Sequence, residues 1–130
     1  MQEGQAVRLT EDKNSAKFQI TAYTSGCLVV NDHEYRQSLI LTPEQLITDW
    51  PVTKIHELSL ETLQPILDLE PQVILIGCGE KMCFPDQSLL HRLMLKNIAL
   101  EVMDNGACCR TYCVLSAEQR NVAAGIILPR

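Results

Sequence analysis

The sequence predicts one α/β domain with three layers and a mixed central sheet. From residue 72 onward, short apolar strands alternate with amphipathic helical segments, which is the pattern of a Rossmann-like β-α-β-α-β half. The first third instead alternates apolar and polar residues between turn signals, as an N-terminal β-meander does. With 130 residues, 46% hydrophobic and 21% charged, the chain has the size and composition of a single folded domain.

Two regions are expected along the chain: a polar arm at residues 1–17 without clear periodicity, and a single α/β domain over 18–130. The net charge of −5 provides no basic surface for nucleic acid. No apolar run approaches the roughly 20 residues of a membrane span. Since the start also resembles neither a signal peptide nor a transit peptide, we expect a soluble cytoplasmic protein whose six cysteines are reduced.

The N-terminal third should form three antiparallel strands, at residues 18–22, 27–30 and 38–41. Apolar and polar side chains alternate in the first, and turn signals at 25–26 and 31–32 separate it from the rest. Pro43 should end the meander because proline cannot donate to a strand ladder.

A helix is expected after Ser59, a suitable N-cap, because Leu60, Leu63 and Leu67 recur at helical spacing. Pro65 would remove a backbone hydrogen bond inside this helix. We therefore expect its regular part to start later than Ser59 indicates.

The second half should follow as a strand at 73–76, a helix near 86–96, a strand at 98–103, a further helix and a last buried strand at 122–128. Strands joined by crossover helices should lie parallel. The inward faces are expected to be Leu89, Leu90, Leu93 and Met94 in the first helix, and Ala107, Thr111, Val114 and Leu115 in the second.

The carboxyl ends of such strands are where ligands usually bind, and two glycine loops, at 77–79 and 104–106, should face one crevice there. The second loop opens a helix, whose free N–H groups and dipole favour an anion. The candidate ligand-binding residues, which would make the protein an anion-binding module or an enzyme using this crevice, are Gly77, Gly79, Asp104, Gly106, Cys109 and Arg110. The alternative is structural: Gly106 permits a tight turn, Asp104 caps the helix and Arg110 pairs with a carboxylate.

Neither a metal nor a cofactor is predicted. A nicotinamide fingerprint needs a third glycine where Met82 stands. Cys109 and Cys113 share a helical face, and Cys78 and Cys83 could approach each other, but there is no C-x-x-C pair, and cysteine is usually a small buried hydrophobe.

A thiol redox sensor remains an open alternative, because Cys108 or Cys109, at a helix N-terminus beside Arg110, could have a lowered pKa. A cysteine hydrolase is not expected, since His33, His56 and His91 lie in other segments. No catalytic residue is therefore predicted.

Three segments carry a resemblance to a known family: residues 74–79, Phe84-Pro85 and above all 103–112, which read MDNGACCRTY. From about Phe18 to Leu128, the chain resembles the domain family that includes the mitochondrial respiratory complex I assembly factor three and an adipogenesis-associated animal protein. Cys78, Asn105 and Cys113 depart from the threonine, threonine and asparagine that are usual there. The missing transit peptide favours a bacterial member.

The resemblance implies a three-layer α/β fold with a mixed sheet, and it brings no catalytic residues. For the mitochondrial member, it implies help in assembling complex I with another assembly factor at the inner membrane. We therefore expect a non-enzymatic assembly factor or interaction scaffold whose protein partners are respiratory-complex subunits or assembly factors. Arg110 and Tyr112 are candidate contacts, since both residue types are enriched at interface hot spots, although Tyr112 could instead fill the helix-sheet interface.

Overall fold

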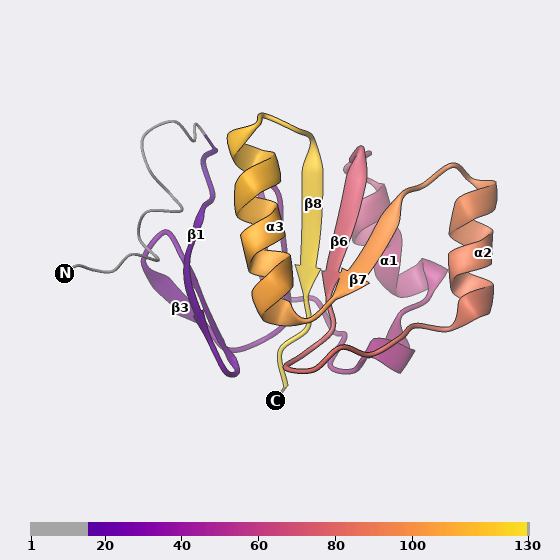
Figure 1. Cartoon of the computed structure of the whole chain (residues 1–130), viewed down its shortest axis with the longest axis horizontal. Coiled ribbons are helices and arrows are strands. Elements are labelled where there is room, and N and C mark those ends of the chain that lie inside the picture. The colour runs from indigo at the N-terminus through magenta and orange to yellow at the C-terminus, as the bar shows by residue number, and fades with distance from the viewer. Residues whose placement is uncertain (1–15, 130) are drawn as a thin grey trace.

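The structure is a computed structural model that describes residues 16–129. Most of the arm predicted at residues 1–17 lies outside the described residues. Two sheets have the strand orders β1-β2-β3 and β5-β4-β8-β6-β7. In Figure 1 the small sheet stands at one side of the large one, with helix α3 (Asn105–Ala117) beside it.

The small sheet is an antiparallel meander of β1 (Ile20–Thr24), β2 (Cys27–Val30) and β3 (His33–Tyr35). The prediction that residues 38–41 close this meander was wrong, because β3 takes that place and β4 (Leu39–Leu41) joins the large sheet. His33 and Glu34 are exposed, so β3 lacks the apolar pattern that would have revealed it. The three residues of β4 are all buried, as a strand inside a covered sheet must be.

The large sheet is mixed, as predicted. β6 (Val73–Gly77) lies between β7 (Leu100–Met103) and β8 (Val122–Ile126) and runs parallel to both. β4 pairs antiparallel with β8, and β5 (Leu46–Ile47) pairs antiparallel with β4. The N-terminal strands therefore extend the C-terminal β-α-β-α-β half.

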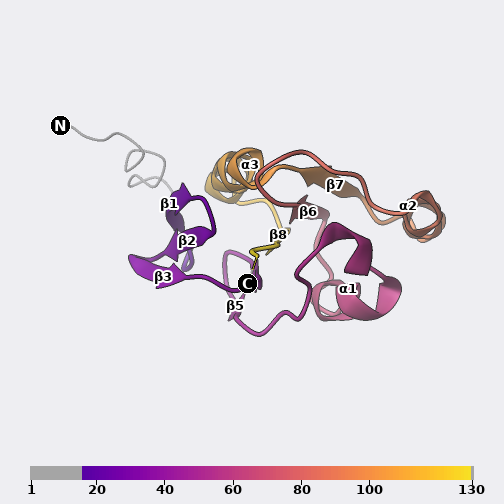
Figure 2. The ribbon, with the colours of Figure 1, turned by 90° about the horizontal axis from the view of Figure 1, so that it is seen from below.

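Both faces of the large sheet are covered, which gives the three layers. Neighbouring residues point to opposite faces: Leu75 packs with α3 and the small sheet, whereas Ile74 and Ile76 pack with α1 (Leu60–Leu67) and α2 (Gln87–Leu95). Figure 2 shows α3 and α1 on opposite sides of the sheet. Within residues 16–129, no helix has the length and apolar composition needed to cross a membrane.

Helix α1 begins directly after Ser59, so the later start expected from Pro65 was wrong. Ser59 Oγ accepts the N–H of Thr62 at 3.1 Å, and Thr62 Oγ1 accepts the N–H of Ser59 at 2.8 Å. This reciprocal cap stabilises the first turn. Pro65 lies inside the helix and cannot donate to the carbonyl of Glu61, which is a single lost bond in a helix that packing holds in place.

The inward faces of the other two helices differ from the prediction. Leu89 and Leu93 of α2 are buried, but Met94 is 69% exposed. Val114 of α3 is 54% exposed. The buried face of α3 comprises Asn105, Cys108, Cys109, Tyr112, Cys113 and Ser116. Cysteine and serine are small, so this face lies close against β6 and β8. The inward face of α3 that was predicted from the spacing of apolar residues was therefore wrong.

A glycine in β8 makes room for the largest buried side chain on the α1 face. A Cβ atom at Gly125 would lie 2.7 and 2.8 Å from Cη2 and Cζ3 of Trp50, and 3.2 Å from Cδ1 of Ile66. Trp50 is 1% exposed and its Nε1–H donates to the carbonyl of Thr62 at 2.8 Å, so the ring cannot move away freely. The indole thus needs a residue without a side chain beneath it.

We expect Gly125→Ala to lower the free energy of unfolding by about 2 kcal/mol, because the added methyl group overpacks the Trp50 site. Urea unfolding followed by Trp50 fluorescence measures this. The matched control is Gly106→Ala, where the new Cβ atom would make only ordinary contacts inside α3. Equal stability of the two variants would contradict the packing argument.

Candidate functional site

Asn105, the first residue of α3, connects separate segments at the carboxyl end of the large sheet. Its side chain is fully buried. Oδ1 accepts the N–H of Gly79 at 3.1 Å, while Nδ2 donates to the carbonyl of Ile127 at 2.9 Å and to the hydroxyl of Tyr23 at 3.2 Å. The loop after β6, the end of β8 and strand β1 thus meet at one amide; we call Asn105 and these three partners the Asn105 cluster.

Backbone contacts fix the same place. The N–H of Asn105 donates to the carbonyl of Gly79 at 2.8 Å, and the N–H of Ile127 donates to the carbonyl of Gly77 at 2.9 Å. A Cβ atom at Gly77 would collide with Asn105 Oδ1 and lie 3.3 Å from the Cβ of Cys108. The first glycine of the loop is therefore explained by the close approach of α3, without any ligand.

Tyr23 joins this cluster to the loop through Glu80. Its hydroxyl donates to the Glu80 carboxylate and accepts from Asn105. Burial, followed by the hydrogen bond to Glu80, raises the pKa of Tyr23 to about 12. The hydroxyl is thus a proton donor throughout the physiological pH range, and it holds the small sheet against the loop.

The structure brings only some of the candidate ligand residues together. Gly77, Gly79 and Asp104 lie around Asn105, and Asp104 Oδ1 accepts the N–H of Ala107 at 2.9 Å, which is the capping role of the structural alternative. Arg110 is exposed on α3.

Cys109 belongs to the core cluster between α3 and the small sheet, so it does not face the same space as Arg110. Asn105 occupies the position above Gly77, and Asp104 uses one of the helix N–H groups. The anion site remains a prediction, and this geometry provides it with fewer free donors than the sequence indicated.

The thiols at the start of α3 are not activated. Burial raises the pKa of Cys108 well above its usual range, and burial followed by the neighbouring Cys113 raises the pKa of Cys109 to about 12 despite the guanidinium of Arg110. Both are protonated near neutral pH. A sensor thiol requires the opposite shift, so this environment disfavours a redox sensor at these two residues.

A second pair of thiols lies in the loop after β6. Cys83 N–H donates to Cys78 Sγ at 3.1 Å, and Cys83 Sγ donates to the carbonyl of Cys78 at 3.3 Å. Cys78 is buried, whereas Cys83 is partly exposed. Among residues 16–129, no group of three or more histidine, cysteine or acidic side chains could hold a metal ion.

Of the two candidate contact residues, only Arg110 offers surface. Tyr112 is fully buried, and its hydroxyl donates to the carbonyl of Phe18 at 2.8 Å. It therefore ties α3 to the chain before β1, and in the folded protein it cannot be a contact residue.

Sequence reasoning missed two exposed apolar residues, Met82 and Phe84, in the loop between β6 and α2. Met82 is 46% and Phe84 78% exposed, and the loop runs along the lower edge of Figure 1 from β6 to α2. In the sequence, Phe84-Pro85 contributes only to the family resemblance, and Met82 stands out only as a departure from a nicotinamide fingerprint. The exposure of these residues could not be read there, because apolar residues more often lie inside.

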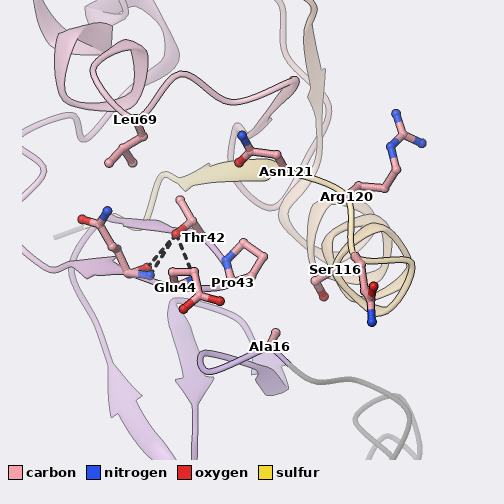
Figure 3. Close-up of a pocket in the computed structure, with 10 residues that line it drawn as sticks. Ala16, Thr42, Pro43, Glu44, Leu69, Ser116, Arg120 and Asn121 are labelled. Carbon is pink, nitrogen blue, oxygen red and sulfur yellow. Dashed lines mark hydrogen bonds between the residues drawn. The ribbon is translucent and has the colours of Figure 1, made fainter.

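A hollow of about 580 Å³ at the opposite end of the sheet was also missed (Figure 3). Its lining consists mostly of polar turn residues, which give no sequence signal of a site: Ala16, Thr42, Pro43, Glu44, Gln45, Leu69, Ser116, Gln119, Arg120 and Asn121. Thr42 Oγ1 already accepts the N–H groups of Glu44 and Gln45, and Asn121 donates to Glu70 and Gln72. Arg120 extends away from Thr42, so the polar groups do not converge.

Comparison with known proteins identifies relatives over almost the whole domain. The model of a family described as protein of unknown function (DUF498/DUF598) matches residues 20–127. The chain is similar to a 13 kDa major membrane protein of Francisella tularensis subsp. holarctica (strain LVS), with 31% identity over 92% of this chain and 98% of that protein. The solution structure of a Xanthomonas campestris protein is 35% identical, with a TM-score of 0.80 over 92% of this chain and 91% of that chain.

A further relative is the NADH dehydrogenase [ubiquinone] 1 alpha subcomplex assembly factor 3 of Xenopus tropicalis. It is 27% identical over 92% of this chain, and the match spans 66% of that longer protein. The similarity therefore covers the α/β domain and leaves about a third of the relative without a counterpart here.

We expect Asn105→Ala to lower the free energy of unfolding by about 3 kcal/mol, because it leaves the Gly79 N–H and the Ile127 carbonyl buried without this partner. Tyr23→Phe removes one bond of the cluster and the exposed bond to Glu80, leaves the bonds of Asn105 to Gly79 and Ile127 in place, and should cost less. Urea denaturation measures both. A loss from Asn105→Ala no larger than that from Tyr23→Phe would contradict the central role of Asn105.

Alkylation should distinguish the thiols. In the native protein at pH 7.5 we expect iodoacetamide to modify Cys83 roughly tenfold or more faster than Cys108 and Cys109, because the latter two are buried and protonated. Peptide mass spectrometry over a time course measures the rates. Rapid modification of Cys108 or Cys109 would restore the sensor hypothesis at the start of α3.

Proposed function

Because the chain belongs to the family of proteins of unknown function DUF498/DUF598, we propose that it is a non-enzymatic factor that binds other proteins during assembly of a respiratory complex. The assembly role is supported by the name of the Xenopus relative. The proposed partners are subunits or assembly factors of respiratory complex I. These partners are inferred from the name of the Xenopus relative, which is longer than this chain.

One observation carries the choice of binding over catalysis. At the carboxyl end of the large sheet, where an enzyme of this architecture would hold its substrate, the buried side chain of Asn105 bonds to the surrounding backbone. In the loop that continues from Gly79 to α2, Phe84 exposes 78% of its surface. A sheet end at which a buried amide bonds to the backbone, followed by a loop with an exposed aromatic residue, suits an anchor for a partner's pocket better than a substrate site.

We propose that the contact surface comprises Met82, Phe84 and Arg110. The first two follow β6 in the loop, and Arg110 is exposed in the second turn of α3, which starts at the same end of the sheet (Figure 1). An aromatic residue supplies apolar area at low entropic cost, and arginine supplies several directed donors.

We further propose a cytoplasmic location. All six cysteines are free, as suits a reducing compartment. The Francisella relative is named a membrane protein, and attachment to a membrane-bound partner would reconcile that name with a chain that binds from the cytoplasmic side.

The test is crosslinked affinity capture from the source cell, with quantification of respiratory complex I subunits and assembly factors. We expect the wild-type chain to enrich them, Phe84→Ser to lower the enrichment roughly tenfold, and Arg110→Ala to lower it less. Leu95→Ser is the matched control, because Leu95 is also exposed, at 71%, but lies at the far end of α2.

A second readout separates assembly from mere binding. In cells that lack the protein, native gels should show less assembled complex I, and the wild-type and Leu95→Ser chains should restore it better than Phe84→Ser. Unchanged complex I in the deleted cells, or a wild-type capture profile equal to background, would refute the assembly role.

A further inference from the structure

The loop between β6 and α2 is held by contacts of two cysteines. Cys83 N–H donates to Cys78 Sγ at 3.1 Å, and the thiol of Cys83 donates to the carbonyl of Cys78 at 3.3 Å. Both thiols also point to one acceptor, the carbonyl of Lys81, at 3.3 Å from Cys78 Sγ and 3.5 Å from Cys83 Sγ. Each sulfur therefore lies against the backbone of the other cysteine, inside a turn of six residues.

We propose that Cys78 and Cys83 are a site of reversible disulfide formation, driven by a low-molecular-weight disulfide such as oxidised glutathione. A disulfide requires two Cβ atoms that lie close together and face each other. The shared acceptor and the reciprocal sulfur-backbone contacts place each sulfur against the backbone of the other cysteine, so we expect bond formation to need local rotation of the two side chains rather than unfolding.

The two cysteines have different accessibility, which fixes the order of the steps. The Cys83 thiolate, being partly exposed, attacks one sulfur of oxidised glutathione, and one glutathione thiolate leaves. Cys78, whose pKa burial raises to about 11, then loses its proton to solvent in a slower second step, and its thiolate attacks Cys83 Sγ of the mixed disulfide and displaces the second glutathione. The protein loses two electrons and two protons, and one oxidised glutathione becomes two reduced ones.

The remaining cysteines do not compete for this pairing. Cys27, Cys108, Cys109 and Cys113 are buried, and the three on α3 belong to the core between α3 and the small sheet. An oxidant in solution therefore reaches Cys83 first. Cys78 is buried as well, but it contacts Cys83, so it is the thiol placed to resolve the mixed disulfide.

Oxidation would change the loop next to the exposed aromatic residue. A disulfide has no S–H groups, so the Lys81 carbonyl loses both thiol donors, and the backbone that leads into Phe84 becomes part of a closed ring. An effect on partner binding rests on the proposed function, whereas the disulfide itself does not depend on it.

The test is disulfide mapping of the full chain in glutathione buffers of increasing oxidised fraction, followed by blocking of free thiols and tryptic digestion under denaturing conditions. Lys81 lies between the two cysteines, so trypsin separates them into the peptides 55–81 and 82–92. We expect these peptides to remain joined after oxidation and to separate after dithiothreitol.

Two variants verify the order of the steps. Cys78→Ser should trap glutathione on Cys83, because the resolving thiol is missing, whereas Cys83→Ser should accumulate neither the disulfide nor the adduct on Cys78. Circular dichroism checks that both variants are folded. Peptides that stay separate at every glutathione ratio, or a disulfide that joins other cysteines or two chains first, would overturn the inference.

Discussion

The arrangement at the carboxyl end of the large sheet depends on the amide of one buried residue. Asn105 both donates and accepts, so it can satisfy the N–H of Gly79 and the carbonyl of Ile127 at the same time, and it also bonds to Tyr23. A buried amide is stable only when its partners are in place. The loop after β6, the end of β8 and strand β1 are therefore held in one arrangement, and the small sheet is held against the rest of the domain.

Two glycines show how closely packed elements restrict the sequence. Gly77 lies under Asn105 and Gly125 lies under Trp50, and in both places a Cβ atom would overlap the neighbouring side chain. Each glycine is therefore required by the side chain that packs on it, Asn105 on Gly77 and Trp50 on Gly125. The pair of Gly77 and Asn105 lies at the end of the sheet at which α/β proteins usually bind ligands, and the proposal of protein binding rather than catalysis rests on this contact.

The cysteines divide into two environments. Those of α3 act as small apolar residues, and burial raises the pKa values of Cys108, Cys109 and Cys113. Cys78 and Cys83 instead structure a loop, with Cys83 reaching the surface. The same residue type thus builds the core on one side of the sheet and a surface turn at its end. Burial also raises the pKa of Cys78 to about 11, so what distinguishes the second environment is the partial exposure of Cys83.

The sequence by itself determined the β-α-β-α-β order of the second half, the cap at Ser59 and, as the structural alternative, the cap at Asp104, because strand alternation and helix capping depend on residues close in the chain. It could not determine that β4 leaves the meander, which side of α3 is buried or that Tyr112 is inaccessible. Nor could it show that the Asn105 side chain lies over Gly77 or that Phe84 is exposed. These features depend on contacts between residues far apart in the chain, such as Tyr112 with Phe18 and Asn105 with Tyr23, and only the tertiary structure brings those residues together.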